Sequence, residues 1–487
     1  MLPLTDIQIG DLSRYIAEKR IANLSDPGTR KTAPTNVYMW YLWNELKVKS
    51  LFIMPSGLFE QNRDSFFTFT PFKPEDIVVI EGSPAKRKEL MKKDGKVFIA
   101  GFNFFNPLRT KQGLQPSDFL FLLNEHPGLK CNVVDEIHMG YANADNQRTN
   151  YWLGAVERYF QFVVMMTGTA VDGKLGTAYP IIRAIEPRYY ADYKDFLRWH
   201  AQYDYFGSIV GWFNHGKIKE IFSRHAIRHS FEEVHGAESV VVYRQVTQMF
   251  HEHYLLYKEL HNKSMIELED KYLEITSGGQ EALRARQILQ CPESLGYAPE
   301  KIQNLKLQKD ELLRVHIANS IQANKPMVIF SPFIAEHKRI ANILREYLKP
   351  EEWGVINGEE SMKRRNEVDA NFKAGKIRIV VASPATCAVG YNWNHVDMMV
   401  FTTLDYKDSS FVQGYRRAIR GARKHPLLVY LLEYANSIDQ RIYEIVENKM
   451  RLAKDIQDDK NVMNFTQNQK NSEPIKDPKG RLTMESF

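Results

Sequence analysis

Two series of short, uninterrupted apolar runs, one in each half of the chain, limit what this sequence can fold into. Runs without alternating polar residues are typical of parallel strands that are covered on both faces, and the stretches between them are long enough for crossover helices. The fold class is therefore predicted as α/β, with two doubly wound parallel-sheet lobes. The first series comprises Ser50–Pro55, Asp76–Glu81, Val97–Phe102, Asn132–Asp135 and Phe160–Thr167. The second comprises Pro326–Phe330, Gly354–Ile356, Ile377–Val381, Asp397–Phe401 and Leu427–Leu432.

The chain between the two series has a different character, with aromatic and charged residues mixed at helical spacing. In the stretch QVTQMFHEHYLLYKELHNK, apolar residues recur at steps of three and four and predict an amphipathic helix. His251 and His253 lie within it, and a solvated helix face is favoured for them over a metal site. We expect a first lobe over 1–185, helical insertions over 186–310, a second lobe over 311–455 and a polar, mobile tail over 456–487.

The composition is that of an ordinary globular protein with a mild excess of positive charge. The 487 residues are 44% hydrophobic, and 65 Lys and Arg against 59 Asp and Glu give a net charge of +6. This charge suits a phosphate-backbone partner without requiring one. Three widely separated cysteines predict neither a disulfide framework nor a paired zinc site. Because no signal peptide or membrane-length apolar run is found, we expect no membrane partner and a cytoplasmic protein, in the host cytoplasm if the chain is viral.

The stretch DPGTRKT, residues 26–32, suits the binding of a triphosphate. In such a loop, backbone N–H groups surround the phosphates, Lys31 reaches the β and γ oxygens, and the hydroxyl of Thr32 binds Mg²⁺. Gly28 provides the turn, but Arg30 stands where the usual pattern has the glycine that precedes the lysine. Taken alone, the stretch is explained equally well as a surface turn with a chance Gly and Lys.

A second stretch, VVDEIH at 133–138, strengthens that interpretation. An apolar strand that ends in two carboxylates places Asp135 to hold Mg²⁺ and Glu136 to orient the attacking water. After the next apolar run, TGTA at 167–170 offers small hydroxyl groups that can hydrogen-bond to this pair, although by itself it is only a turn. The two motifs in order predict a site that hydrolyses ATP with Mg²⁺.

A third stretch, QGYRRAIRGARK, lies in the second lobe. Gln413, Arg417 and Arg420 are spaced to share one face of a helix. Guanidinium groups on such a face can contact the γ-phosphate from across a cleft and stabilise the charge of the transition state. The ordinary meaning of an arginine cluster is a solvated basic helix, which is disfavoured here because a complete phosphate site is predicted in the other lobe.

Taken in order, these stretches resemble the superfamily 2 helicase-like ATPases, and most closely the Swi/Snf-type DNA translocases. The resemblance covers about residues 5–450 and includes IMPSGLFEQN, RHAIRHSFEEV, LRARQILQCP, MVIFSPF and the run into TCAVGYNW, which lacks the family's paired glycines. It implies two RecA-like lobes with ATP between them. It further implies catalytic roles for Lys31, Asp135, Glu136, Arg417 and Arg420, and Mg²⁺ ligation by Thr32 and Asp135. Nucleotide contacts are implied for Gln8, Gly28, Thr29, Arg30, Lys31, Thr32, Gly390 and Gln413, and DNA contacts for Ser56, Ser331, Lys363, Arg364 and Arg365.

The function that the resemblance implies is an ATP-dependent DNA translocase or helicase, stimulated by duplex, forked or branched DNA. Such a compact motor, of the kind carried by bacteria and bacteriophages, is expected to act as a monomer in replication, recombination or repair. Translocation is favoured over strand separation because no obvious wedge is identified in the sequence. Two alternatives stay open: an RNA helicase of the Asp-Glu-x-His type, and a pseudo-ATPase scaffold in which Arg30 has impaired the nucleotide loop.

Overall fold

The apolar runs of the first half form one parallel sheet. The computed structural model describes residues 1–457 apart from 111–112, 169–170, 172–174, 237–239, 263–264, 268–271, 275–277, 298, 303, 389–390, 406–407, 420–422 and 424. In the described residues this sheet has seven strands, all parallel, in the order β11-β1-β8-β7-β2-β4-β3. The strands are β1 (Arg20–Asn23), β2 (Lys49–Ile53), β3 (Ile77–Val79), β4 (Val97–Ala100), β7 (Leu129–Asp135), β8 (Phe162–Met166) and β11 (Ala226–Ile227).

Helices cover both faces of this sheet because alternate strand residues point to opposite sides. In β2, Phe52 packs in one apolar cluster, whereas Leu51 and Ile53 pack in the cluster on the other face. The first cluster lies under α1 (Asp6–Glu18), α2 (Thr32–Leu46) and α3 (Phe59–Phe69). The second lies under α4 (Pro84–Met91), α5 (Asp118–Glu125), α6 (Ile137–Tyr141), α7 (Gln147–Tyr159), α8 (Tyr179–Ile185) and α10 (His215–His225).

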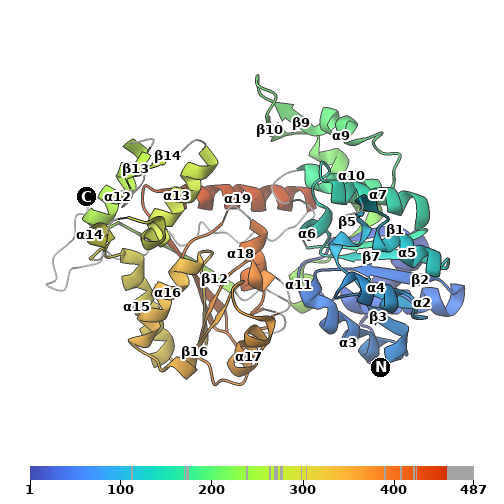
Figure 1. Ribbon diagram of the computed structural model, residues 1–487, viewed down its shortest axis with the longest axis horizontal. Coiled ribbons are helices and arrows are strands. Elements are labelled where there is room, and N and C mark those ends of the chain that lie inside the picture. The colour runs from blue at the N-terminus through green and yellow to red at the C-terminus, as the bar shows by residue number, and fades with distance from the viewer. Residues whose placement is uncertain are drawn as a thin grey trace.

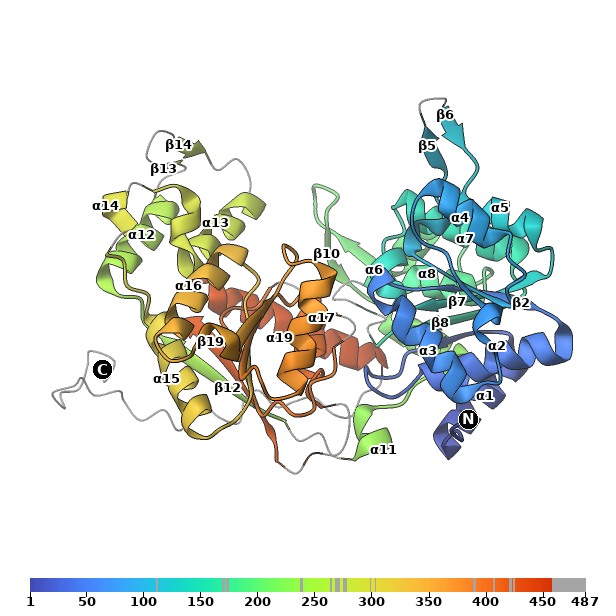
Figure 2. The same cartoon turned by 60° about the horizontal axis from the view of Figure 1, so that its bottom comes forward.

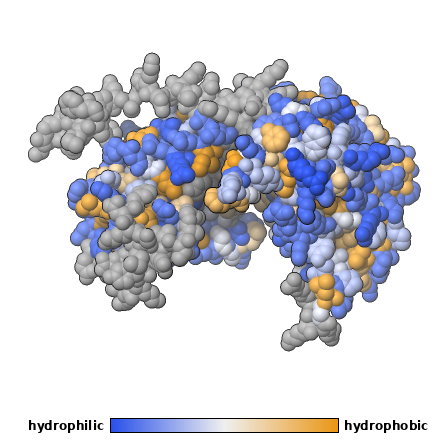
Figure 3. All heavy atoms as spheres, turned by 90° about the horizontal axis from the view of Figure 1, so that it is seen from above, coloured by the Kyte–Doolittle hydropathy of each residue, from blue (hydrophilic) through white to orange (hydrophobic). Residues whose placement is uncertain are grey.

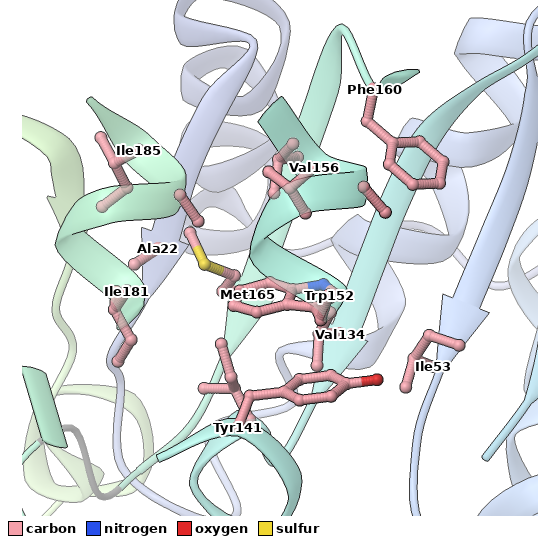
Figure 4. Packing of buried hydrophobic residues seen from close by; sticks show 14 of the residues in the cluster. Ala22, Ile53, Val134, Tyr141, Trp152, Val156, Phe160, Met165, Ile181 and Ile185 are labelled. Atoms are coloured by element: carbon pink, nitrogen blue, oxygen red, sulfur yellow. The ribbon is translucent and has the colours of Figure 1, made fainter. Parts of the chain in front are cut away.

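An aromatic pair at the centre of the second cluster supports the strand that carries the acidic motif. The rings of Tyr141 and Trp152 stack with their centroids 4.7 Å apart and their planes 4° apart (Figure 4). The buried indole N–H of Trp152 donates to the side-chain oxygen of Asn132 at 2.9 Å. Asn132 in turn donates to the carbonyl of Leu51 at 3.1 Å. These bonds satisfy the polar groups that β7 brings into the core.

The apolar runs of the second half form a second parallel sheet. Its six strands in the described residues lie in the order β12-β19-β18-β15-β17-β16. They are β12 (Val240–Thr247), β15 (Met327–Phe330), β16 (Trp353–Ile356), β17 (Ile379–Ala382), β18 (Met398–Phe401) and β19 (Leu427–Tyr434). One face packs under α15 (Gln308–Gln322) and α16 (Ile334–Arg345), the other under α17 (Met362–Lys373), α18 (Asp408–Tyr415) and α19 (Ile438–Gln457). The predicted α/β class with two parallel-sheet lobes is confirmed.

The range 186–310, expected as helical insertions, also supplies an edge strand to each sheet. β11 pairs with β1, and β12 pairs with β19 along its whole length. The remaining elements are α9 (Tyr193–His200), β9 (Ala201–Tyr203), β10 (Ile209–Trp212), α11 (Phe231–His235), α12 (His251–Asn262), β13 (Met265–Glu267), β14 (Tyr272–Glu274), α13 (Gly278–Gln290) and α14 (Pro299–Ile302). A further hairpin, β5 (Leu108–Thr110) and β6 (Gly113–Gln115), projects from the first lobe (Figure 2).

The amphipathic helix predicted around residue 250 begins later than its sequence pattern. Val246 belongs to β12, because pairing with β19 provides backbone hydrogen bonds that a helix there would forfeit. Within α12, His251 is exposed, as expected for a solvated face. The expectation is wrong for His253, which is fully buried. Its Nε2 atom lies 2.9 Å from the carbonyl oxygen of Ile288 in α13.

The two lobes lie side by side, and α19 runs from the second lobe toward the first (Figure 1). It packs against α10 of the first lobe and against α18 of the second. Seen from above, the surface is hollowed between the lobes, and apolar side chains gather near the middle, where the lobes meet (Figure 3). The predicted tail falls outside the described residues from 458 onward. None of the helices in the described part of the chain is long and apolar enough to cross a bilayer.

Candidate functional site

The DPGTRKT stretch forms the loop between β1 and the start of α2. Gly28 has a φ of +90°, a conformation open to glycine. The ammonium of Lys31 lies 2.6 Å from the carbonyl oxygen of Ser25 and 2.9 Å from that of Asp26. Burial lowers the pKa of Lys31, although the charges of Glu136, Asp135 and Asp26 oppose this shift. The loop thus holds a desolvated cation beside the N-terminus of a 15-residue helix, an arrangement that favours anions.

Arg30 takes the backbone conformation that the missing glycine would take. Its φ is +63°, in the left-handed region, and its side chain is exposed at the rim of the loop. The side-chain amide of Gln8 donates to the Arg30 carbonyl at 3.3 Å. Gln8 itself caps α1 in a reciprocal pair with Thr5. The arginine therefore keeps the turn at the cost of some backbone strain, and Gln8 holds the loop from outside.

Substitutions at residue 30 are expected to follow backbone preference rather than charge. Arg30→Gly should leave the free energy of unfolding within about 1 kcal/mol, whereas Arg30→Val should lower it by about 1–2 kcal/mol because β-branched residues disfavour positive φ. Urea denaturation of both variants measures this. A several-fold gain in ATP turnover in Arg30→Gly would instead indicate that the arginine impairs the loop.

The acidic pair lies at the end of β7, where Asp135 is the last residue of the strand and Glu136 follows it. The backbone N–H of Glu136 donates to the Asp135 carboxylate at 3.0 Å, and Glu136 has a φ of +49°. Burial and the neighbouring Glu136 charge raise the pKa of Asp135 to about 7, against the opposing effect of Lys31. The Oε2 atom of Glu136 is buried, has no hydrogen-bond partner among the described residues and lies 3.4 Å from the Nδ1 atom of His138. A divalent cation fits here, because it relieves the crowding of two carboxylates and prefers oxygen ligands such as those of Asp135 and Thr32.

His138 links this pair to two other segments. Its Nδ1 atom lies 2.8 Å from the hydroxyl of Thr167, which follows β8. Its Nε2 atom lies 3.3 Å from the side-chain amide nitrogen of Gln413 in the second lobe. The expected contact between the TGTA stretch and the acidic motif therefore runs through His138 and Thr167, while residues 169–170 lie outside the described part of the chain.

A cavity of about 420 Å³ joins the two lobes at this point. The volume lies in the range of small-molecule sites. Arg417, from the second lobe, is 6% exposed and reaches the same cavity as Lys31. The lining residues are Pro27, Gly28, Arg30, Lys31, Thr32, Leu58, Gln61, Asn62, Ser65, Asp135, Glu136, Asn392 and Arg417. Sequence reasoning assigned no nucleotide contact to Gln61, Asn62 or Ser65 of α3, although the first two end the IMPSGLFEQN stretch.

Gln413 and Arg417 do not share the predicted helical face, because only Gln413 lies within α18. α18 ends at Tyr415, and the next backbone bonds are turn-like, from the Arg417 N–H to the Gly414 carbonyl at 3.3 Å. The Arg417 carbonyl accepts instead from the N–H of Trp393 at 2.7 Å. The Arg417 backbone is thus held by a tertiary hydrogen bond. Arg420 and Gly390 lie outside the described residues.

Arg416 lies in the turn after α18 and reaches the lysine loop. The sequence did not single out this residue. Its guanidinium lies 3.1 Å from one carboxylate oxygen of Asp26. The other oxygen of Asp26 lies 3.0 Å from Arg228, and the N–H of Phe231 donates to the carboxylate at 3.0 Å. Burial tends to raise the pKa of Asp26, but the two guanidiniums and the N–H outweigh it and lower the pKa.

The stretch RHAIRHSFEEV, noted for its family resemblance, wraps around the same loop. Besides the contacts of Arg228 and Phe231, the His229 N–H donates to the Ser25 hydroxyl at 3.0 Å. His235, the residue directly after this stretch, has its Nε2 atom 3.0 Å from the Gly28 carbonyl oxygen. The segment thus fixes the lysine loop from outside, a role that residue types alone could not reveal.

His229 should make the stability of the first lobe depend on pH. A hydrogen bond to Asp11 at 2.7 Å raises the pKa of His229 despite partial burial. A raised histidine pKa contributes stability that is fully present below the unfolded pKa and is lost as pH rises through the folded pKa. The stability difference between wild type and His229→Gln should therefore be larger at about pH 5.5 than at about pH 8.5. Equal differences at the two pH values, by urea denaturation, would contradict this.

The residues predicted to contact DNA fall into two groups. Ser56, at the start of a short helical turn (Ser56–Leu58), is exposed, as are Lys363 and Arg364 at the start of α17. Arg365 beside them is partly buried. The structure contradicts the predicted DNA contact of Ser331. Its side chain is fully buried, and its hydroxyl donates to the Glu336 carboxylate. A strand-end serine was expected at the surface, but here it satisfies a buried acid.

Comparison with known proteins agrees with this arrangement. The sequence model of the helicase conserved C-terminal domain matches residues 308–422. The chain is similar to chromodomain-helicase-DNA-binding protein 1-like of Danio rerio, at 23% identity over 88% of this chain and 41% of that protein. It is also similar to an uncharacterized ATP-dependent helicase of Mycoplasma pneumoniae, at 21% identity over 85% of this chain and 38% of that protein. The chain thus spans about two fifths of the length of these relatives.

A solved structure shares the fold. The Hef helicase domain of Pyrococcus furiosus aligns with 90% of this chain and 97% of its own, with a TM-score of 0.51 and 13% identity. The SWI2/SNF2 ATPase core of Sulfolobus solfataricus, determined in complex with dsDNA, covers 93% of both chains with a TM-score of 0.40 and 18% identity. The two parallel-sheet lobes have a RecA-like fold. The matched second lobe and these relatives support a helicase-like protein similar to the Swi/Snf type of superfamily 2.

Proposed function

We propose that this chain is a DNA-stimulated ATPase that moves along duplex or branched DNA. One observation supports this above all: Lys31, Asp135 and Glu136 of the first lobe line the same cavity as Arg417 of the second. A triphosphate in this cavity meets cations from both lobes. Hydrolysis of the triphosphate therefore changes the contacts between the two lobes. A motor requires such a change.

Each residue of the cavity has a distinct task in this proposal. Lys31 and the N–H groups at the start of α2 bind the β- and γ-phosphates. Thr32 and Asp135 would hold Mg²⁺, which neutralises phosphate charge when it is bound. Glu136, whose Oε2 atom is buried near His138, orients the attacking water. Arg417 stabilises the charge of the transition state, and Arg420 and Gly390 stay assigned from the sequence alone.

Movement along DNA would follow from changes in the contacts between the lobes. Two such contacts lie beside the nucleotide cavity, the Arg416–Asp26 ion pair and the approach of Gln413 to His138. Because His138 also contacts Thr167, the nucleotide state of the first lobe can alter the position of α18. Alternate opening and closing, with each lobe holding the backbone in turn, would produce a step.

The proposed partner is the DNA backbone, with candidate contacts at Ser56, Lys363, Arg364 and Arg365. Phosphate contacts of this kind carry little sequence information. One relative is named for DNA binding, and one solved neighbour was determined with dsDNA. We further propose a monomer that acts in replication, recombination or repair.

The test is the ATPase rate measured with duplex, forked, four-way and single-stranded DNA and with RNA. The proposal expects stimulation by DNA and strong salt dependence, because phosphate contacts release counterions. Greater stimulation by RNA than by any DNA would favour the RNA helicase. Glu136→Gln is the matched control, since it keeps the side-chain shape and removes the charge. Wild-type hydrolysis no faster than that of Glu136→Gln would favour the pseudo-ATPase scaffold.

A further inference from the structure

A β-hairpin of the first lobe carries two aromatic rings into solvent. It consists of β9 and β10, and its turn presents Tyr205, which is 97% exposed, and Phe206, which is 88% exposed. Single exposed apolar residues are common, but a contiguous exposed patch marks an interaction site. Further exposed apolar residues continue the patch along the hairpin and its base, namely Trp199, Tyr203, Ile209, Val210 and Phe213.

The turn that presents the two rings is held by a specific set of hydrogen bonds. The Asp204 carboxylate accepts from the N–H of Phe206 at 3.0 Å and from the N–H of Ser208 at 2.8 Å. Gly207 has a φ of +79°, and its N–H donates to the Asp204 carbonyl at 3.1 Å. The rings of Tyr205 and Phe206 lie edge to face, with centroids 5.5 Å apart. The aromatic tip, Tyr205 and Phe206, is therefore presented on an ordered turn.

The base of the hairpin is fixed to the first lobe. His200, fully buried, has its Nε2 atom 2.7 Å from the Tyr190 hydroxyl and its Nδ1 atom 3.1 Å from the Phe213 carbonyl. Lys217 lies 4.0 Å from the ring centre of Trp199, so a cation and an exposed aromatic ring flank the hairpin together. Arg198, largely exposed, adds a second cation at the end of α9. Because these contacts fix the base of the hairpin, a force that acts on the tip is transmitted to the first lobe.

The hairpin stands at the border between the lobes. Figures 1 and 2 both place β10 on the side of the first lobe that faces the second. A cavity of about 680 Å³ separates β10 from the loop that follows α6. That loop, residues 142–145, comes directly after the VVDEIH motif and its helix. The hairpin base is thus adjacent to the segment that leads away from the hydrolytic site.

We propose that the aromatic tip separates nucleic-acid strands, stacking on the first unpaired base of a fork as the motor advances. This inference rests on the translocase function above and adds strand separation to it. Flat rings match the exposed faces of unpaired bases, and base–aromatic stacking tolerates any sequence. Asp204 is the one charged residue between Trp199 and Phe213, and its carboxylate accepts from two backbone N–H groups of the turn. The cations that flank the hairpin, Arg198 and Lys217, suit contacts with phosphates.

The test compares two activities in the double variant Tyr205→Leu/Phe206→Leu, which keeps apolar bulk but removes the rings. Displacement of a third strand from a blunt duplex reports translocation without unpairing. Displacement of one arm of a fork, with 2-aminopurine at the junction, reports strand separation and base stacking. The double variant should separate forks at least about tenfold more slowly and lose the 2-aminopurine response, while third-strand displacement stays within about twofold.

Two control variants complete the test. Tyr347→Leu removes an exposed ring from the second lobe and should change neither activity. Tyr205→Trp/Phe206→Trp keeps the rings and should retain fork separation. Wild type that displaces the third strand but does not open forks would overturn the inference and leave the translocase intact. Unchanged fork opening in the leucine variant would also overturn it. The hairpin would then be expected to bind a protein partner. Failure of wild type to displace the third strand would instead refute the translocase itself.

Discussion

Lys31→Ala is expected to lower DNA-stimulated ATP hydrolysis by about 10²–10³-fold while the lobe stays folded. The ammonium is the buried cation of the loop, and its removal leaves the phosphates without their only lysine partner among the residues that line the cavity. The measurement is steady-state phosphate release with saturating duplex DNA. Circular dichroism and the thermal unfolding midpoint report on the fold.

The matched control is Lys47→Ala, which removes a lysine from the other end of α2. Lys47 is exposed and donates to the carbonyl of Asn44 at 3.0 Å, far along the helix from the cavity. Its loss should change turnover by less than about twofold, because single surface substitutions are usually mild. Full turnover in Lys31→Ala would exclude this cavity as the hydrolytic site.

Asp26→Ala is expected to lower the free energy of unfolding by about 3–5 kcal/mol. The substitution leaves the guanidiniums of Arg228 and Arg416 and the N–H of Phe231 without their common partner in a largely buried place. Because the folded pKa of Asp26 is lowered, its contribution is fully present above about pH 4 and is lost as pH falls through the folded pKa. Urea denaturation at neutral and acid pH measures both effects.

Two comparisons distinguish the contribution of the Asp26–Arg416 contact between the lobes from the general effect of removing a carboxylate on the free energy of unfolding. Asp94→Ala breaks ion pairs of similar length to Lys49 and Lys96, but the Asp94 side chain is 80% exposed. Its effect should stay below about 1 kcal/mol. A double-mutant cycle of Asp26→Ala with Arg416→Ala should give a coupling of about 0.5–3 kcal/mol. A coupling of zero would show that the Asp26–Arg416 pair contributes nothing to holding the lobes together.

The sequence determined the secondary structure wherever a local pattern was sufficient. Continuous apolar runs are specified by burial on both faces of a parallel sheet, so the ten predicted strands were found with ends shifted by a few residues. The lysine loop and the acidic pair were also predictable, because each places its chemistry within a few consecutive residues at the end of a strand. Their meeting in one cavity follows from parallel strands ending at the same edge of the sheet.

Tertiary structure decided what depends on partners far apart in the chain. Val246 has helical periodicity but forms a strand because β19 offers an unpaired edge. Ser331 has the sequence context of a surface residue but binds a buried glutamate.

Arg416 reaches Asp26 from the turn that follows the end of α18 at Tyr415, where the Trp393 N–H donates to the Arg417 carbonyl. The hairpin tip was indistinguishable from any aromatic stretch until its turn and its place beside the lobe border were known. Local sequence carries propensity and periodicity, whereas these outcomes depend on contacts between segments that only the folded chain brings together.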